Sequence, residues 1–378
     1  MKIETIKGFR DYSGEEARKR SEIRRIIVET FERYGFEPAE TPVIESEEFV
    51  KGDNKEDEAV SDIYRLKDKG ERNLALRYEF TFQLKRLMKN KKLPYKRYQI
   101  GPVFRDEPVS SERGRQFIQC DIDTVGSTVK DEAEILAAFN ELFKQLGIKP
   151  MILVNNRKLL NEVLDYAKID KKDRENVLRE IDKYDKLPEK QVIKNLDKYG
   201  AGNLIPEFKK GSKFFSQFKS YKEVLELVNI CKDYGVEAIF LPTVVRGLSY
   251  YDGSVFEIKA KGLKSSIAGG GSYTFNKTPS TGISFSIERL STVAKLTKES
   301  ERMLIISLNE DKEAIKIAQA LRRNKKNVSI FYGKPSKALQ YANSYGFTKA
   351  IFVGKQEVKK REFKVKDLKT GGQSRLEL

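Results

Sequence analysis

Apolar residues recur at helical spacing in two regions of the first 150 residues. In residues 15–34 they fall on one face of a predicted amphipathic helix, and they are Ile23, Ile26, Ile27, Thr30, Phe31 and Tyr34. Gly35 and Pro38 follow, which predicts that this helix ends there and that the chain becomes extended. Residues 131–147 keep the same period and finish on a glycine, so they predict a second helix.

Shorter apolar runs lie between these helices and predict β-strands. Residues 61–79 hold two such runs around a DKGER turn, which is typical of a hairpin. Residues 95–107 and 115–126 predict two further strands joined by a polar loop. The segment FTFQLKRLMKNKK, residues 80–92, predicts a helix instead.

The pattern changes again in the second half of the chain. Residues 157–215 are rich in Lys and Asp and helical in period, which predicts an inserted helical module. Strand patterns resume at 236–247 and 255–260, and the glycines of AGGGSYTF, residues 268–275, predict a turn. Residues 281–296 predict either a strand or a strand that leads into a helix.

A linker, TKESER, separates these segments from a distinct terminal unit. The runs RMLIISL, VSIFYG and AIFVG predict strands, and the two segments between them predict helices. Strands that alternate with helices are typical of a small α/β domain.

Charge and composition point to a polyanionic partner. The 378 residues include 73 Lys and Arg against 56 Asp and Glu, a formal charge of +17. Residues 301–378 alone carry 18 basic and 8 acidic residues, a net charge of +10. Nucleic acid is the commonest partner of so basic a protein, and the basic footprint is concentrated in the terminal unit.

The rarest residues exclude several classes of chemistry. The chain has no histidine, which excludes Ser-His-Asp triads, histidine bases and histidine metal ligands. Cys120 and Cys231 are too few for a zinc site or a disulfide framework and suit a reducing compartment. The N-terminus lacks the apolar core of a signal peptide, and no apolar run approaches about 18 residues, so a cytoplasmic protein with no membrane span is expected. Catalysis here has to rest on arginines, carboxylates, tyrosines, metal ions or the substrate.

Three segments hold residues suited to a reaction at phosphate. In 97–123, Arg105 and Glu107 share one side of the strand pair, as do Gln119, Asp121 and Asp123. An arginine fork bonds two phosphate oxygens at once. A solvated charged hairpin is the alternative interpretation of this segment.

The other two segments lie closer to the end of the first unit. In VVRGLSYYDGSVFE, residues 244–257, Tyr250 and Tyr251 project to opposite faces if the chain is extended; a packed hairpin is the alternative. AGGGSYTF precedes Glu288 and Arg289 at the start of a predicted helix. Its glycine spacing matches neither the dinucleotide fingerprint nor the P-loop.

Together and in this order, the motifs resemble class II aminoacyl-tRNA synthetases, and among them the histidyl-tRNA synthetase family, over nearly the whole chain. KGFRDY resembles the family's opening, and YGFEPAETPVIE, with Pro42, is similar to the dimer-forming motif 1. FRDE with RQFIQCDID resembles motif 2, and GISFSIER resembles motif 3. LRYEFT and VVRGLSYYDGSVFE resemble the two histidine signatures.

The resemblance implies an α+β fold with an antiparallel-sheet catalytic domain. Residues 1–156 and 216–298 would form this domain, 157–215 a helical insertion, and 302–378 a C-terminal α/β anticodon-binding domain. The implied activity is ATP-dependent attachment of histidine to tRNA(His) through a histidyl-adenylate. Its implied requirements are ATP and Mg²⁺, with no metal ligands of the protein identified, and its implied assembly is a homodimer.

The resemblance also implies roles for single residues on the ATP side. Arg105 would bind the α-phosphate and Glu107 the adenine amino group. Arg113 and Arg289 would hold the outer phosphates. Arg246 would lie between the substrate carboxylate and the α-phosphate, so Arg246 and Arg105 are the implied catalytic residues.

On the histidine side the implied residues are Glu79, Thr81 and Gln119 for the amino group, Asp123 and Tyr251 for the two imidazole nitrogens, and Tyr273 as a wall. Asp123 stands where many members have Glu, and Ser272 stands where Arg is frequent. The PVSSE loop lacks the basic residues that commonly touch the tRNA acceptor end.

Two other functions compete with this interpretation. A regulatory subunit of ATP phosphoribosyltransferase shares the catalytic fold but would have lost the signature residues and the terminal domain, whereas Arg105, Arg246 and Arg289 remain here. A plain RNA-binding module accounts for the charge but not for the tyrosine and arginine signatures.

Overall fold

The computed structural model describes residues 3–52, 58–110, 114–246, 250–261, 263, 265–296 and 301–376. The chain divides into two compact units. The first holds residues 1–11 and 19–295, and the second holds 12–18 and 296–378. None of the helices that the structure describes has the length and apolar character needed to cross a bilayer.

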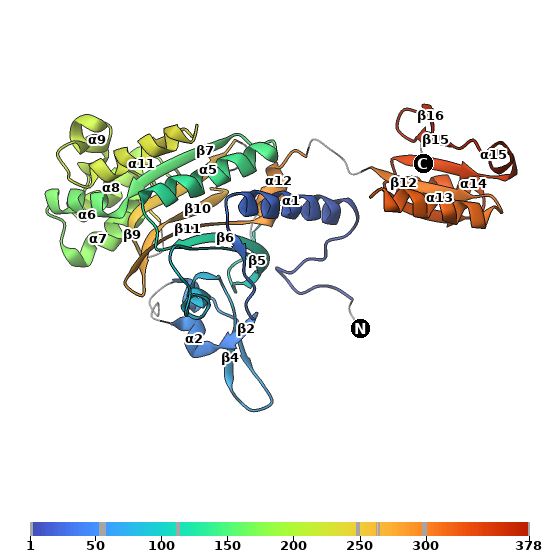
Figure 1. The fold of residues 1–378 in the computed structure, drawn as a ribbon. Helices are drawn as coiled ribbons and strands as arrows, with labels where there is room; N and C mark the ends of the chain where they lie inside the picture. The colour runs from blue at the N-terminus through green and yellow to red at the C-terminus, as the bar shows by residue number, and fades with distance from the viewer. Residues whose placement is uncertain are drawn as a thin grey trace. The chain divides into compact units, whose positions relative to one another are not determined.

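An eight-stranded, mainly antiparallel sheet is the framework of the first unit (Figure 1). In spatial order its strands are β1 (Glu37–Pro38), β5 (Tyr95–Phe104), β6 (Gln116–Val125), β11 (Thr278–Ser286), β10 (Ala268–Phe275), β9 (Tyr251–Ala260), β7 (Pro150–Asn156) and β8 (Ala238–Phe240). Only the outer pairs β1/β5 and β7/β8 are parallel. The predicted α+β class is therefore confirmed.

Helices cover one face of this sheet, whereas the opposite face carries polar side chains beside an apolar cluster that includes Tyr95 of β5 and Val125 of β6. The helices include α1 (Gly14–Arg33), α5 (Val129–Gln145) and α11 (Tyr221–Asp233), followed in sequence by β8. Phe31 of α1 packs against Tyr98 of β5, Phe139 of α5 and Phe285 of β11, with ring centroids 5.8–6.4 Å apart. The alternation of a strand then places residues next to Tyr98 and Phe285 in sequence on the opposite face.

A three-stranded sheet and short helices follow α1 in the chain. The strands are β2 (Ile44–Ser46), β3 (Arg65–Lys67) and β4 (Asn73–Leu76), and the helices are α2 (Glu47–Lys51), α3 (Glu58–Ser61), η1 (Thr81–Gln83) and α4 (Leu84–Leu87). Antiparallel pairing of β3 with β4 confirms the predicted hairpin. The helix predicted over 80–92 is wrong beyond residue 87. Asn90 adopts a φ of 65°, a left-handed conformation that no α-helix continues through.

Small helices occupy the segment between β7 and α11. They are α6 (Arg157–Tyr166), η2 (Lys171–Asp173), α7 (Arg174–Ile181), α8 (Glu189–Asp197), α9 (Leu204–Phe208) and α10 (Ser212–Phe215). Aromatic rings hold part of this segment to the sheet, since the ring of Phe215 lies 4.9 Å from that of Phe240 in β8.

Two predictions for the second half of the sheet are wrong. The turn predicted for AGGGSYTF is a strand, β10, paired on both sides. The strand predicted over 236–247 stops at Phe240, because Pro242 follows and the chain leaves the sheet. The buried Asn155 holds the departing backbone by donating from Nδ2 to the carbonyls of Pro242 and Val244, both at 3.0 Å.

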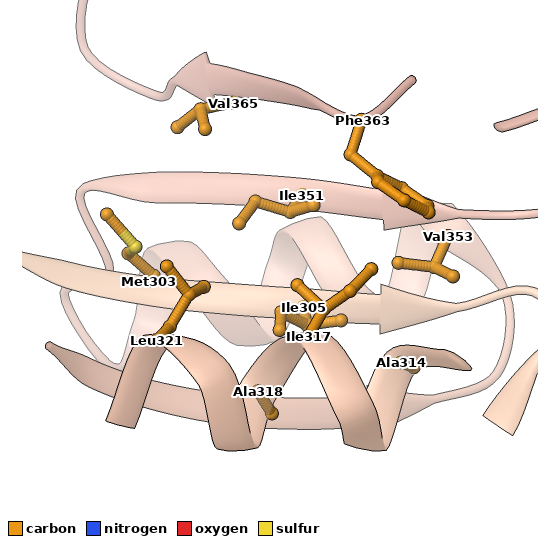
Figure 2. Packing of buried hydrophobic residues seen from close by; sticks show 10 residues of the cluster. All are labelled: Met303, Ile305, Ala314, Ile317, Ala318, Leu321, Ile351, Val353, Phe363 and Val365. Carbon is orange, nitrogen blue, oxygen red and sulfur yellow. The ribbon is translucent and has the colours of Figure 1, made fainter. Parts of the chain in front are cut away.

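The second unit is a five-stranded sheet in the order β13-β12-β14-β15-β16. Its elements are β12 (Arg302–Ser307), α13 (Asp311–Arg323), β13 (Asn327–Tyr332), α14 (Pro335–Ser344), β14 (Lys349–Val353), α15 (Lys355–Lys360), β15 (Lys364–Asp367) and β16 (Gln373–Arg375). Figure 2 shows Ile317 and Leu321 of α13 packed against Ile305 of β12 and Ile351 of β14. The predicted α/β character is confirmed, while β15 and β16 had no counterpart in the sequence prediction.

Candidate active site

A polar cavity of about 680 Å³ lies on one face of the large sheet. The other face is the one on which Phe31 of α1 packs against Tyr98 and Phe285. The lining of the cavity comes from β6, β9, β10 and β11 and from α12 (Ile287–Val293). The segments that follow β4, β5 and α7 and the segment that precedes β9 also line it. Ten of the site residues implied by the motifs line the cavity: Glu79, Thr81, Arg105, Glu107, Gln119, Asp123, Arg246, Tyr251, Tyr273 and Arg289. The remaining one, Arg113, lies outside the described residues.

The floor of the cavity is built by β6. Gln119, Asp121 and Asp123 alternate along this strand and all line the cavity, as their spacing predicts. Arg97 of β5 stands opposite Asp123, and its Nη2 lies 2.7 Å from Asp123 Oδ2. Both side chains are almost completely buried, with 0% and 5% exposure. The floor therefore contains an ion pair that water barely reaches.

Asp123 is held from a second side by β10. The hydroxyl of Tyr273 donates to Asp123 Oδ1 at 2.6 Å. Burial, then the Asp123 carboxylate, raises the pKa of Tyr273 well above its usual range, so this phenol remains a donor. Gly282 of β11 leaves room for the acid, since a Cβ there would lie 2.2 Å from Asp123 Oδ1.

Two adjacent tyrosines close the same end of the cavity. Tyr250 and Tyr251 do not project to opposite faces as predicted; their ring centroids are only 4.6 Å apart. Tyr250 precedes β9 in a turn, so the extended geometry assumed for the pair does not apply. Burial raises the pKa of both phenols, which keeps their hydroxyl protons available for hydrogen bonds.

Arg246 lies across the glycines of β10. A Cβ on Gly269 would come within 2.3 Å of Arg246 Nη1, so a side chain at that position would displace the guanidinium. The Arg246 Nε is buried and has no hydrogen-bond partner among the described residues. An unpaired donor in a cavity points to a ligand that supplies the acceptor.

A second arginine is fixed where β5 ends. Arg105 Nε donates to the carbonyl of Tyr78 at 3.1 Å, and Nη2 donates to Gln119 Oε1 at 3.4 Å. Its guanidinium also covers the ring of Phe117 at 5.2 Å. Glu107 is nearby, with Oε1 3.7 Å from Arg105 Nη1.

Arg289 occupies the first turn of α12. Ser286 caps this helix by accepting from the Arg289 backbone N–H at 3.3 Å, and Arg289 Nη1 donates to the carbonyl of Ser266 at 3.0 Å. The capped helix therefore presents Arg289 to the cavity, where the family resemblance would place it.

Strand register orders these groups along the cavity. Asp123 is level with Gly282 and, through it, with Gly271 of β10. Asp121 is level with Ser284 and Gly269, where Arg246 lies, and Gln119 is level with Ser286. Arg105 and Arg289 lie beyond Gln119 in the same direction. The cavity thus has Asp121, Asp123 and the tyrosines at one end and three arginines toward the other, where Glu107 and Glu257 also lie. This arrangement suits a substrate with a cationic end and an anionic reacting centre.

Sequence reasoning missed three residues of this site. Asp121 was placed on the correct face but given no role, although its spacing from Gln119 and Asp123 was visible. Arg97 carried only a weak signal, because its pairing with Asp123 depends on the register of β5 against β6. Glu257, which lines the cavity from β9, carried none beyond its place in the tyrosine segment.

Comparisons with known proteins agree with this arrangement. The sequence model of a family described as "Histidyl-tRNA synthetase" matches residues 8–290, and one described as "Anticodon binding domain" matches 302–378. "Histidine--tRNA ligase 1" of Bacillus cereus is 32% identical, over 100% of this chain and 96% of the relative.

Solved structures are similar over the same length. A histidyl-tRNA synthetase from a Nostoc species superposes with a TM-score of 0.87 at 25% identity, covering 100% of this chain and 97% of the other. A Bacillus halodurans protein described as "ATP phosphoribosyltransferase regulatory subunit/histidyl-tRNA synthetase" reaches 0.76 at 20% identity, covering 93% and 98%. At that identity the second match supports the fold alone.

Proposed function

Since the chain belongs to the histidyl-tRNA synthetase family and is a histidine–tRNA ligase, we propose that the cavity on the large sheet is where histidine and ATP react. The observation that carries this proposal is the order of charges along the cavity, from Asp123 on β6 to Arg105 directly after β5. Histidine brings an ammonium group and an imidazole, and ATP brings phosphates. The two ends of the cavity match these two sets of groups.

The first chemical step needs no protein base. The α-carboxylate of histidine attacks the α-phosphorus of ATP, a new P–O bond forms, and pyrophosphate leaves. The carboxylate is already ionised at neutral pH, so catalysis is positioning and neutralisation of negative charge. Arg246 and Arg105 supply the neutralising positive charge at the α-phosphate. Arg289 and Arg113 bind the outer phosphates, and Glu107 binds the adenine amino group. A chain without histidine is sufficient for this chemistry.

The second step transfers histidine to tRNA. The terminal ribose hydroxyl attacks the carbonyl of the adenylate, and AMP leaves. A phosphate oxygen of the adenylate accepts the hydroxyl proton, so this step also proceeds without a protein base.

Selectivity for the side chain comes from the buried end. Asp123 and Tyr251 each bond one imidazole nitrogen, and Tyr273 forms a wall and holds Asp123. A carboxylate paired with Arg97 only accepts hydrogen bonds, so it selects a ring N–H. An amino acid without ring nitrogens would leave these buried polar groups unpaired, which costs about 1–3 kcal/mol for each group. Glu79, Thr81 and Gln119 take the amino group.

Mg²⁺, bound together with ATP, would supply positive charge that neutralises the phosphates. Among the described residues no three acidic or cysteine side chains are grouped to hold a metal, so phosphates would supply most ligands. Glu257, one of several carboxylates that line the cavity, would be a protein ligand for Mg²⁺ on the phosphate side. It accepts from the hydroxyl of Ser266, whose carbonyl accepts from Arg289, so it lies on the phosphate side.

Three further proposals concern partners and location. The terminal unit, with its net charge of +10 over residues 301–378, contacts phosphates of tRNA(His). A homodimer is supported by the motif 1 resemblance and by exposed Ile44 and Leu66 in the edge strands of the three-stranded sheet; sedimentation should give twice the chain mass. A cytoplasmic location is supported by the free thiols of Cys120 and Cys231.

A regulatory subunit without activity is the less supported alternative, because the arginines and tyrosines of the site are all present. ATP–pyrophosphate exchange measured with each of the twenty amino acids tests the proposal. We expect exchange with histidine only. Exchange with another amino acid would show that the cavity does not select histidine. No exchange with any amino acid would favour the regulatory alternative.

A further inference from the structure

Asp121 is the one acid on the floor of the cavity with no role in the scheme above. It is 4% exposed and lines the cavity. Its Oδ2 accepts from Gln119 Nε2 at 3.1 Å. Its Oδ1 accepts no hydrogen bond from any residue that the structure describes. A buried carboxylate oxygen without a donor is costly unless a ligand supplies one.

Contacts on both sides fix the amide of Gln119. Arg105 donates to its Oε1, and Asp121 accepts from its Nε2. A guanidinium only donates and a carboxylate only accepts, so a rotated amide would lose both bonds. Asp121 Oδ2 is therefore occupied in positioning Gln119, and Oδ1 is the oxygen left for a ligand.

Charge on the floor calls for a cation beside Asp121. Glu79, Asp121 and Asp123 are buried acids that interact electrostatically, and Arg97 and Arg77 are the buried cations near Asp121. Arg77 donates its hydrogen bonds to the carbonyls of Thr41 and Pro102. Arg97 forms its ion pair with Asp123. Asp121 has no ion pair of its own among the described residues, so a cationic ligand group is the natural counter-charge.

The position of Asp121 along β6 identifies that group. Asp121 stands between Asp123, proposed for the imidazole, and Gln119, proposed for the amino group, about 6.6 Å of strand from each. Arg246, proposed for the substrate carboxylate, is level with Asp121 across the cavity. The Cα of histidine lies between its ring and its carboxylate, so its ammonium falls beside Asp121.

We propose that Asp121 binds the α-ammonium group of histidine through Oδ1 while Oδ2 holds Gln119 in place. This rests on the proposed function, because it takes histidine as the ligand. It adds a charged partner for the ammonium group to the residues that the family motifs imply.

Binding of three ligands to the full-length chain tests this assignment. Histidine carries all three groups, histidinol lacks the carboxylate, and imidazolepropionate lacks the ammonium. In Asp121→Asn we expect titration calorimetry to show histidine and histidinol binding 10- to 100-fold more weakly, because a charge-assisted bond is lost. Imidazolepropionate should bind no more weakly than to the wild type. Asp252→Asn removes an exposed acid on β9 and should leave all three affinities unchanged.

The possible outcomes separate the two proposals. Equal weakening of all three ligands, or of none, overturns the role of Asp121. If the wild type binds none of them, the proposed function fails first. Asp121→Ser, which is smaller and uncharged, replaces Asp121→Asn should that variant not fold, and the same ligand pattern is expected.

Discussion

Glycines at single positions create the space that the functional side chains occupy. Gly269 of β10 and Gly282 of β11 lie in paired strands, where most residues would fit the backbone. A Cβ at Gly269 would meet Arg246, and one at Gly282 would meet Asp123. The glycines of these strands therefore leave room for the protein's own side chains and do not form a turn.

Gly269→Ala should impair catalysis while the fold persists. Its Cβ would lie 2.3 Å from Arg246 Nη1, the mobile end of a long side chain, so the guanidinium moves and the strand stays. We expect histidine-dependent pyrophosphate exchange to fall at least tenfold, since small misplacements of this kind cost up to about 10²-fold. Gly70→Ala, whose nearest contact would be an ordinary 3.4 Å, is the matched control. A normal exchange rate in Gly269→Ala would show that Arg246 needs no fixed position.

Asp121 should make stability depend on pH in a definite direction. Burial, aided by Asp123 and Glu79 and opposed by Arg97, raises the pKa of Asp121 well above its usual range. Between the ordinary and the raised pKa, the folded chain binds a proton that the unfolded chain has lost. The free energy of unfolding therefore falls as pH rises through that window.

Asp121→Asn removes this contribution. The melting temperature of the ligand-free variant, relative to wild type, should increase as pH is raised from the ordinary Asp range toward neutrality and above. Thermal unfolding followed by circular dichroism over that pH series measures it. A difference that does not change with pH would mean that Asp121 is not the group responsible.

At the scale of elements, periodicity predicted the longest and most local features well. Helix α1 begins and ends within one residue of the predicted 15–34, and the β3/β4 hairpin is present. The alternation of β6 correctly placed Gln119, Asp121 and Asp123 on one face. These features depend only on neighbours in the sequence.

Features set by distant contacts were not predictable. The sequence of β10 predicted a turn because glycines are common in turns. Its glycines are needed instead because a Cβ would clash with Arg246 or with the β11 backbone, which lie more than ten residues away in sequence. The partnership of Arg97 with Asp123 requires the β5/β6 register, and the close contact of Tyr250 with Tyr251 requires the turn before β9. Single-sequence patterns hold no record of such contacts.

The N-terminal cap of α12 fixes the turn that carries Arg289, which we propose binds the outer phosphates of ATP. Ser286→Ala removes the acceptor for the Arg289 N–H and should lower stability by about 1 kcal/mol. Because the cap positions the turn that carries Arg289, KM for ATP should rise more than KM for histidine. Ser291→Ala, which loses only a bond to the Glu288 carbonyl on the same helix, should leave the ratio of the two KM values unchanged. Equal changes in both KM values would show that the cap has no specific effect on phosphate binding.

At the scale of the whole molecule, chemistry and tRNA binding are expected to separate between the units. The first unit holds every described residue of the cavity, and the second has its own core and much of the positive charge. A chain shortened to residues 1–298 should still activate histidine but charge tRNA poorly, because it lacks the phosphate contacts of the terminal unit. Pyrophosphate exchange and tRNA charging, measured side by side, distinguish the two steps. Full charging by the shortened chain would contradict this division.

The central claim is that the cavity activates histidine by arginine stabilisation at the α-phosphate, and Arg246 tests it most directly. The measurement is single-turnover formation of histidyl-adenylate, compared with transfer from preformed adenylate, in wild type, Arg246→Ala and Arg246→Lys. Activation by Arg246→Ala should fall about 10²–10³-fold. Transfer should fall less, and Lys should restore activation only in part, since a point charge cannot reproduce the fork. Equal losses in both steps, or full restoration by Lys, would contradict the account.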